Sequence, residues 1–183
     1  MINLRSKLQR DLLGYYFTNP TASHYVRELA GILGADPTNL SRELARLETQ
    51  GLFRSEIRGR QKYFAIDRSH PLYKELRQLI FKTTGVVGRL RDAMRTIKGL
   101  EEAVLYGSFA QNQQDASSDI DVLIVGAPDA EHLEDAMGKL ERRLGREINY
   151  TLLSPKELQS RRSRKNSFIE DVFRKKHIDL LSR

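Results

Sequence analysis

Residues 106–126 read YGSFAQNQQDASSDIDVLIVG. A Gly-Ser pair leaves one apolar run, a polar loop follows, and two aspartates one residue apart enter a second apolar run. The apolar runs predict two buried strands, at 102–106 and 120–125. Residues at i and i+2 of a strand point to the same side, so Asp119 and Asp121 present a paired anionic face. Two adjacent carboxylates are costly without a cation, which predicts a metal site.

Gly107 and Ser108 meet a second chemical need, the holding of a phosphate. A glycine leaving a strand lets backbone N–H groups approach an anion closely, because it has no Cβ. The serine hydroxyl adds a donor. Together with a magnesium-binding carboxylate pair, this favours a nucleotide-transfer site. The alternative is a polar hairpin between two buried strands, with no ligand.

The spacing of these motifs resembles that of a known family. Gly-Ser, a spacer of ten residues, and Asp-Ile-Asp before an apolar strand resemble the minimal nucleotidyltransferases of the DNA polymerase β superfamily, over residues 99–153. The resemblance implies that Gly107 and Ser108 hold a nucleoside triphosphate. It also implies that Asp119 and Asp121 ligate Mg²⁺ or Mn²⁺.

This sequence departs from the family at a third carboxylate. By the resemblance, a later strand carries an acid between apolar residues that helps to bind the catalytic metal and activates the attacking hydroxyl. Asn149 fills that position here, and an amide is a neutral ligand and a poor base. Glu147, two residues earlier on the same strand face, is the other candidate. The departure leaves nucleotide and metal binding possible and puts catalysis in question.

The rest of the second half alternates between helical and strand patterns. Apolar spacing predicts a helix at 129–144, a strand at 148–153, and helices at 155–163 and 167–175. We therefore expect an α+β chain in which residues 99–183 form a nucleotidyltransferase-like mixed sheet with flanking helices.

The first half has a different order of elements. Helices are expected at 2–16, where Ile2 and Leu4 begin the apolar stripe, then after a cap at Thr21 or Ser23 as far as Gly34, and at about 37–50. A hairpin at 52–66 follows. Residues 1–68 resemble a winged helix-turn-helix, which implies that the third helix and the wing contact double-stranded DNA. The residues implied in DNA contact are Thr38, Asn39, Ser41, Arg42 and Arg46 on the helix, with Arg58, Arg60 and Lys62 on the wing.

The charge distribution agrees with that division. Residues 1–98 hold 18 Lys and Arg against 9 Asp and Glu, whereas residues 99–183 hold 13 against 15. A basic half is typical of a nucleic-acid-binding module, although a solvated basic surface explains it equally. Because one module reads one half-site, we expect a homodimer.

Residues 69–98 are expected to form a connecting or dimerisation helix that starts at Ser69 and Pro71. Gly85 and Gly88 interrupt its apolar pattern and mark a break or a hinge. The four histidines are scattered without metal-ligand spacing. Asp115 is interpreted as a solvated loop acid.

Composition sets the remaining bounds. The chain has 183 residues, 39% of them apolar, and no cysteine, which excludes disulfides and thiolate metal sites. We expect no signal peptide and no membrane span, and a cytoplasmic location.

Three functional hypotheses remain. The first is a DNA-binding, transcriptional-regulator-like protein that carries a magnesium-dependent nucleotidyltransferase domain. The second is an active enzyme of toxin-antitoxin type that transfers a nucleoside monophosphate to a protein or small molecule, with the winged helix docking a protein partner. The third is a degenerate transferase that senses a nucleotide and alters DNA affinity.

Overall fold

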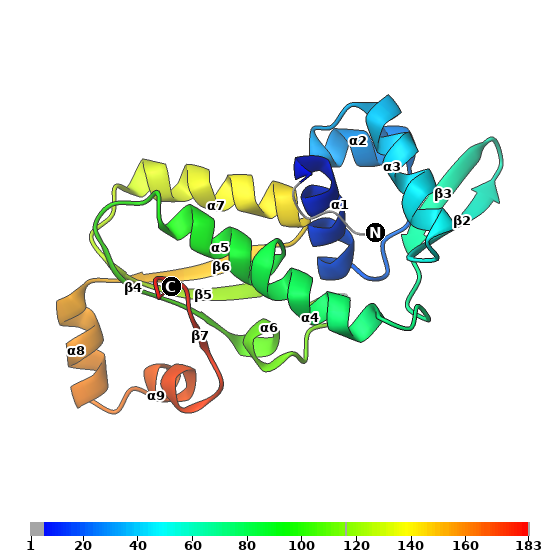
Figure 1. Cartoon of the computed structure of the whole chain (residues 1–183). Helices are drawn as coiled ribbons and strands as arrows, with labels where there is room; N and C mark the ends of the chain where they lie inside the picture. Colours follow the sequence, from blue (N-terminus) through cyan, green and yellow to red (C-terminus); the bar gives the residue numbers. More distant parts are fainter. Residues whose placement is uncertain (1–5, 116, 183) are drawn as a thin grey trace. The chain divides into compact units, whose positions relative to one another are not determined.

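The computed structural model describes residues 6–115 and 117–182, and the chain forms two compact units (Figure 1). Among the described residues, the first unit holds those up to Gly88 together with 143–145, and the second holds 89–142 and 146–182.

The helices that lie wholly within the described part of the first unit are α1 Lys7–Thr18, α2 Val26–Leu33, α3 Pro37–Thr49 and α4 Tyr73–Thr83. Local chemistry fixes several ends. Asp36 caps α3 by accepting a hydrogen bond from the Asn39 amide at 2.9 Å, and a proline at the first helical position needs no N–H partner. Gly34 ends α2 in the left-handed conformation, as predicted. The predicted start of α1, at Ile2 and Leu4, lies outside the described residues.

The predicted cap of α2 is wrong. Neither Thr21 nor Ser23 caps this helix, which begins after Tyr25 without a side-chain cap. The preceding residues form a short strand, β1 (His24–Tyr25), which pairs with Tyr63 and Phe64. Strand pairing holds this backbone extended, so the helix starts later than the polar residues suggest.

The predicted hairpin is present. Strands β2 (Phe53–Arg58) and β3 (Gln61–Ile66) pair antiparallel, and Arg58 lies opposite Gln61 across a two-residue turn. Gly59 adopts φ +60° in that turn, which few other residues tolerate. With β1 the hairpin forms a sheet of order β1-β3-β2.

An apolar core joins the helices to this sheet. Each of its helices contributes leucine, isoleucine or aromatic side chains at helical spacing. Tyr16 is fully buried and donates its hydroxyl proton to the carbonyl of Phe64 at 2.8 Å, which satisfies its polar atom. The fully buried members include Leu12, Leu13, Leu29, Leu40, Leu44 and Leu47.

The predicted connecting helix begins later than expected and breaks at Gly85. Helix α4 starts at Tyr73 with no side-chain cap, and Ser69 instead bonds Asp67 in a turn. Helix α5 follows (Val86–Met94). Within it, a Cβ at Gly88 would overlap the Thr83 carbonyl, so a side chain there would push the two helices apart.

The second unit is built on a mixed sheet of order β6-β5-β4-β7. Its strands are β4 Leu100–Tyr106, β5 Ile120–Gly126, β6 Ile148–Leu153 and β7 Ile178–Asp179. β5 runs antiparallel to β4 and parallel to β6. The parallel pair needs a crossover, which helix α7 (Ala130–Leu144) supplies. This sheet confirms the expected α+β class.

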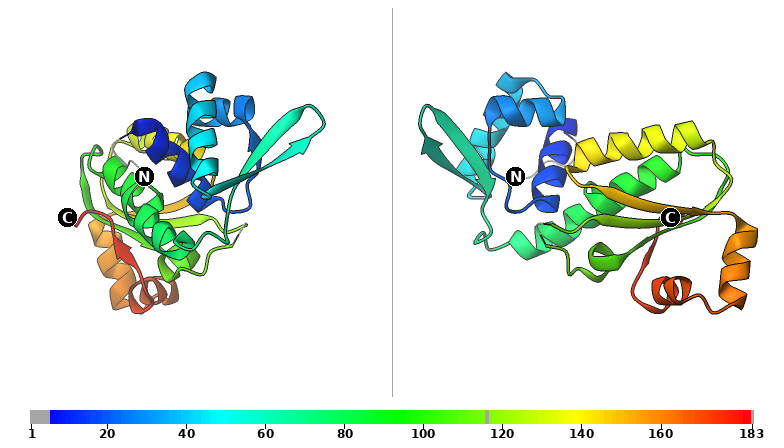
Figure 2. Two further views of the ribbon diagram at one scale, coloured as in Figure 1. Left: turned by 45° about the vertical axis from the view of Figure 1, so that its right-hand side comes forward. Right: turned by 180° about the vertical axis from the view of Figure 1, so that it is seen from behind.

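The remaining helices of the second unit lie close to the sheet. They are α6 Gly107–Gln111, α8 Pro155–Ser163 and α9 Ser167–Arg174. Helices α8 and α9 lie on the side of the sheet opposite α7 (Figures 1 and 2). Their buried Leu158, Ile169 and Val172 pack with Leu123 and Val125 of β5. Across the described ranges, no helix is long and apolar enough to span a membrane.

Candidate functional site

Gly107 and Asp121 meet where β4 ends. Tyr106, the last residue of β4, lies opposite Asp121, so the chain leaves the strand beside this carboxylate. Gly107 has φ +71°, and a Cβ on it would overlap Asp121 Oδ2. The positive φ and the closeness of Asp121 Oδ2 therefore both require glycine at position 107.

Asp121 faces the side of the sheet covered by α9. Leu123 and Val125, which alternate with it along β5, pack there against Ile169. Asp121 is half-buried, and burial raises the pKa of its carboxyl, with the negative charge of Asp119 adding to the increase. A group held in this way favours either a proton or a metal cation beside it.

Asn149 completes the cluster. The parallel register places it opposite Asp121 on β6, and its Nδ2 atom donates a hydrogen bond to Asp119 Oδ2 at 3.2 Å. The side chains of Asp119, Asp121 and Asn149 thus gather at one end of the two strands. The amide occupies the place in which the family resemblance implies a third carboxylate.

Glu147 lies one residue before β6, and its side chain is exposed. Its backbone carbonyl accepts a hydrogen bond from the Ile120 amide at 2.9 Å, which fixes the start of the parallel pair. Within residues 6–115 and 117–182, no group of three or more His, Asp or Glu side chains forms a metal-binding cluster. The side-chain oxygen atoms in this cluster belong to two carboxylates and one amide.

The loop before Asp119 is ordered by Asp115. Its Oδ1 atom accepts hydrogen bonds from the Ser117 amide and hydroxyl at 2.9 Å and from the Ser118 hydroxyl at 3.0 Å. These bonds lower the pKa of the exposed Asp115 carboxyl. Arg146 donates to the Ser118 carbonyl at 3.2 Å. Asp115, interpreted from the sequence as a solvated loop acid, therefore also holds the loop in its conformation.

Ser108 is half-buried in α6, directly after Gly107. Its carbonyl accepts a hydrogen bond from the Gln113 amide at 2.9 Å, which closes the short helix. Phe109, next in sequence, is buried in the core. The packing of Phe109 fixes the position from which the Ser108 side chain projects.

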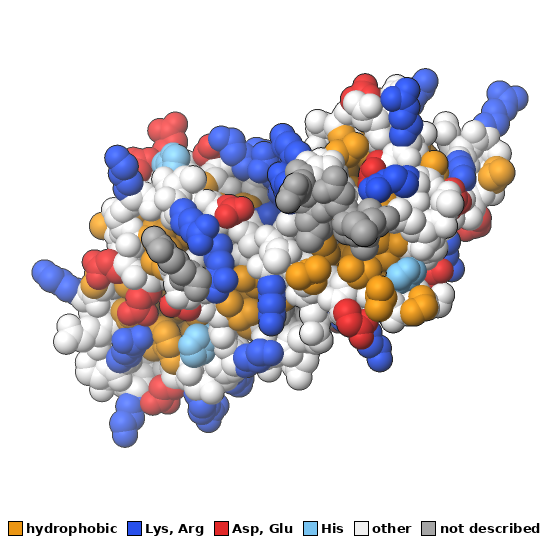
Figure 3. All heavy atoms as spheres, viewed as in Figure 1, with side chains coloured by type: hydrophobic (Ala, Val, Ile, Leu, Met, Phe, Trp, Pro, Cys, Tyr) orange, Lys and Arg blue, Asp and Glu red, His pale blue; other side chains and the backbone are white. Residues whose placement is uncertain are grey.

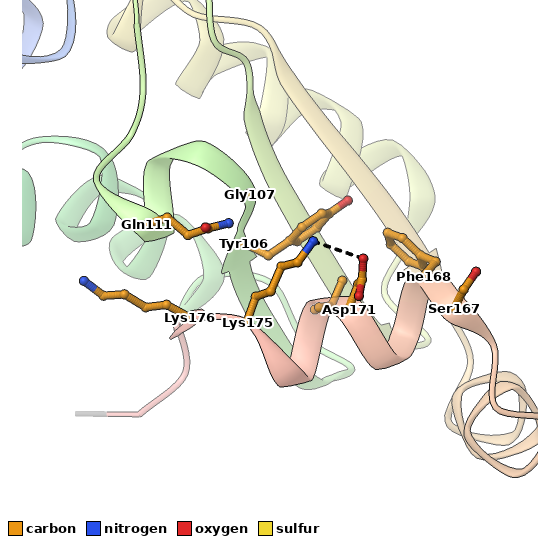
Figure 4. A pocket seen from close by; sticks show the side chains of 9 residues that line it. Tyr106, Gly107, Gln111, Ser167, Phe168, Asp171, Lys175 and Lys176 are labelled. Atoms are coloured by element: carbon orange, nitrogen blue, oxygen red, sulfur yellow. Dashed lines mark hydrogen bonds and ion pairs between the residues drawn. The ribbon is translucent and has the colours of Figure 1, made fainter.

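A pocket of about 320 Å³ lies between α6 and α9, beside Gly107 (Figure 4). Lys175 Nζ forms an ion pair of 3.0 Å with Asp171 there. Sequence reasoning missed this pocket, since only a basic helix end gives a signal for it. Its lining residues are Tyr106, Gly107, Gln111, Ser167, Phe168, Asp171, Val172, Lys175 and Lys176.

Two aromatic rings form one wall of this pocket. The ring of Tyr106 meets that of Phe168 edge to face, with centroids 5.7 Å apart. Burial raises the pKa of the Tyr106 hydroxyl and Asp121 adds to it, while a hydrogen bond with Thr151 lowers it. Tyr106 therefore links the pocket to the aspartates.

The residues predicted to contact DNA are exposed in the first unit. Three of the basic ones form ion pairs with nearby acids: Arg46 with Glu43 at 2.6 Å, Arg58 with Glu56 at 3.1 Å, and Lys62 with Glu48 at 2.7 Å. The exposed set is Thr38, Asn39, Ser41, Arg42, Arg46, Arg58, Arg60 and Lys62.

A groove of about 620 Å³ lies where α3 meets β3. Thr38, Ser41 and Arg42 line it from α3, with Gln61 and Lys62 from β3. On the face in Figure 3, Lys and Arg side chains are interspersed with Asp and Glu rather than gathered into one continuous patch. The excess of Lys and Arg in residues 1–98 therefore does not form an uninterrupted basic surface on that face.

No curated protein matches the chain in sequence. A toxin-antitoxin structure with AMP-PNP is 21% identical, covers 53% of this chain and 73% of its own, and has a TM-score of 0.38. A candidate nucleotidyltransferase from Sulfolobus solfataricus is also 21% identical, covers 51% and 73%, and has a TM-score of 0.28. The model of the nucleotidyltransferase domain family matches residues 87–181, which is more than half of the chain. The predicted nucleotidyltransferase domain is thereby confirmed, and the protein belongs to the nucleotidyltransferase domain family.

Proposed function

We propose that the second unit transfers a nucleoside monophosphate from a nucleoside triphosphate to a hydroxyl group of a protein or small molecule. The observation that carries this proposal is the meeting of Gly107, Asp121, Asp119 and Asn149 at the ends of β4, β5 and β6. A phosphate-holding turn and a carboxylate pair are the two parts that the reaction requires.

The residues fit Mg²⁺ or Mn²⁺. These ions prefer oxygen ligands, and two carboxylates with one amide oxygen supply them. The environment of Asp121 is a second argument. Burial, and then the negative charge of Asp119, raise the pKa of its carboxyl, and a cation beside the two aspartates would offset both effects. When bound, the metal would neutralise charge on the phosphates.

The chain's own groups have distinct roles in the proposed reaction. The Gly107 and Ser108 amides and the Ser108 hydroxyl hold the phosphate, while Asp119 and Asp121 hold the metal. The acceptor oxygen bonds to the α-phosphorus as the bond to the bridging oxygen breaks, and pyrophosphate leaves. Asn149 cannot take the acceptor's proton, so the proton goes to a carboxylate oxygen of Asp119 or to solvent.

Incubation with each labelled nucleoside triphosphate, Mg²⁺ and cell extract tests this proposal. We expect label on a protein or small molecule with the intact chain, and a loss on the order of 10²- to 10³-fold with Asp119→Ala or Asp121→Ala. Absence of transfer from all four nucleotides, or equal transfer by the variants, contradicts it.

Asn149 favours a second candidate, a nucleotide sensor. The Asn149–Asp119 hydrogen bond holds a neutral amide where a base would act. Such a site binds a nucleotide without turnover. Nucleotide binding by calorimetry, with no pyrophosphate released over hours, supports the sensor, and steady pyrophosphate release contradicts it.

For the first unit we propose a winged helix-turn-helix that binds double-stranded DNA as a homodimer. The support is the groove between α3 and β3, where polar and basic groups from the helix and the wing converge. A gel-shift assay at low salt tests it, and no affinity for any genomic fragment contradicts it. In that case the alternative role, docking of a protein partner, is retained.

A further inference from the structure

Strand β6 lies at the edge of the mixed sheet, and within the described part of the chain it pairs only with β5 (Figure 1). We propose that this edge joins a second copy of the chain, through antiparallel pairing of β6 with β6 of that copy. The two sheets then continue as one across the dimer. The proposal needs neither nucleotide transfer nor DNA binding, and it gives the homodimer proposed for DNA binding a specific contact surface.

The backbone of β6 shows which of its residues can pair on the outer side. The Ile120 amide donates to the Glu147 carbonyl, so Glu147 and every second residue after it point their backbone groups towards β5. The intervening residues Ile148, Tyr150 and Leu152 therefore point theirs outward. An outward row of N–H and C=O groups is a template for pairing with another strand.

The two ends of this outer edge already have hydrogen-bond partners. The Ile148 amide donates to Glu141 Oε1 at 2.9 Å, and the capping box of α8 holds the Ser154 amide. Between these ends, the outward amides of Tyr150 and Leu152 have no partner in the part of the chain that the structure describes. The centre of the edge is therefore open to a second strand, whereas its ends are closed.

One register pairs all of the open groups. When Thr151 lies on the two-fold axis, Tyr150 faces Leu152 of the second copy, and Leu152 faces Tyr150 of that copy. Each of these pairs exchanges both of its backbone hydrogen bonds. A register centred on Tyr150 instead requires the Ile148 amide, which Glu141 already holds. The capped ends therefore select the register centred on Thr151.

The exposed side chains of β6 fit the same register. Tyr150 and Leu152 are 37% and 40% exposed, and they are among the large apolar side chains that the described surface exposes. They lie on one face of the strand, so in the antiparallel pair each covers the other across the axis. The sequence of β6, INYTLL, also has no charged residue and no proline, which are the features that protect an exposed edge from pairing.

Two alternatives compete with this interface. A strand of a different protein can add to an open edge. A second copy fits better, because the groups that one β6 offers in this register are the groups that the other requires. Helix α4 is the other candidate surface for a dimer, since Leu72 and Leu79 are also exposed. The experiments separate these cases.

Sedimentation velocity of the full chain over a dilution series measures the Kd of the dimer. Tyr150→Lys and Leu152→Glu should each raise this Kd about tenfold or more, because each buries a charge against an apolar side chain. Leu79→Lys is the matched control, since it replaces an exposed leucine of α4 by a charge. It should change the Kd less than about twofold.

The double variant, Tyr150→Lys with Leu152→Glu, tests the register. The new lysine of each copy faces the new glutamate of the other when Thr151 lies on the axis. The double variant should therefore dimerise about fivefold more tightly than either single variant. In the register centred on Tyr150 the two lysines face each other, and the double variant dimerises no better than the single variants.

A crosslink tests the position of the axis independently. The chain has no cysteine, so Thr151→Cys introduces a single thiol. Thr151 and its copy form a pair without hydrogen bonds, with Cα atoms about 4.5 Å apart, which is within the reach of a disulfide. Mild oxidation should convert Thr151→Cys to a covalent dimer on a non-reducing gel. Thr96→Cys, at an exposed position of the same unit, should stay monomeric on that gel.

Circular dichroism confirms that each variant is folded. An intact chain that is monomeric at all concentrations overturns the proposal, and so do β6 variants that dimerise as tightly as the intact chain. Loss of the dimer in Leu79→Lys alone overturns it and assigns the interface to α4. It is also overturned if the double variant does not recover the dimer and Thr151→Cys forms no crosslink. The labelled-nucleotide and gel-shift assays are separate measurements, so failure of this interface is distinguishable from failure of the proposed function.

Discussion

The two units bring their polar side chains together in different ways. In the second unit, Asn149 reaches Asp119 across thirty positions of sequence, through the register of two parallel strands. In the first unit, the candidate DNA contacts lie on one helix and one hairpin, and Arg46 pairs with Glu43 only three residues away. Side chains that one element presents follow from local spacing, whereas a site made by several strands depends on how the sheet is assembled.

Exchange of a left-handed glycine in each unit gives the largest expected effect. Gly107 and Gly34 have similar φ, +71° and +60°, but only Gly107 has a neighbour where a Cβ would stand. Gly107→Ala should cost about 2–4 kcal/mol of unfolding free energy, from the backbone and from overlap with Asp121. Gly34→Ala should cost about 1 kcal/mol, from the backbone alone.

Urea denaturation followed by circular dichroism measures both glycine variants. Nucleotide titration of the same samples measures nucleotide affinity, which should fall for Gly107→Ala only. Equal costs for the two variants would show that Gly107 is required by its backbone angle and not by its approach to Asp121.

Much of this architecture follows from the sequence, and the reasons for the exceptions are physical. The strand at 148–153 and the helix at 155–163 were predicted with their observed bounds, because apolar spacing and Ser154-Pro155 act locally. Strand β1 was missed, since two residues carry no periodicity and pair only because β3 lies beside them. The pocket beside α9 was missed for the same reason, because Gln111 and Lys175 line one cavity only after the chain folds.

Asn149→Asp tests the site that the strands of the second unit form together. Its expected effect is the second largest. A carboxylate opposite Asp121 adds a charged oxygen ligand, so Mg²⁺ affinity should rise about tenfold, the ~1.4 kcal/mol of one partly exposed charge pair. Without metal, three carboxylates repel one another, and the variant should be less stable in EDTA.

Calorimetry with Mg²⁺ measures this change in affinity. Asn149→Ala is the control, since it removes the hydrogen bond to Asp119 and adds no charge. If Asn149→Asp binds Mg²⁺ no better than Asn149→Ala, position 149 does not face the metal.

Arg42→Ala tests the candidate DNA contacts of the first unit, which lie on one helix and one hairpin. Arg42 is exposed in the groove beside α3, so its loss should weaken DNA binding by about 1 kcal/mol, roughly fivefold. The slope of log affinity against log salt should fall by about one. Lys74→Ala removes an exposed charge from α4 and should change neither quantity. Gel-shift titration at several salt concentrations measures the DNA affinity and its dependence on salt. Equal losses of affinity for Arg42→Ala and Lys74→Ala would mean that the whole positive charge of the unit, and not the groove, attracts DNA.

The smallest expected effect is the stability change caused by Asp121→Asn in EDTA. The folded chain holds a proton on Asp121 more tightly than the unfolded chain does, because burial and Asp119 raise its pKa above the ordinary 3.8. As pH rises through 3.8, the unfolded state loses this proton first, so the folded state loses stability until pH passes the raised pKa. Asparagine does not titrate, so the variant should match the intact chain near pH 3.5 and exceed it at pH 7. Urea denaturation at both values measures the difference, and a variant less stable than the intact chain at pH 7 would show that Asp121 makes favourable contacts that outweigh its burial.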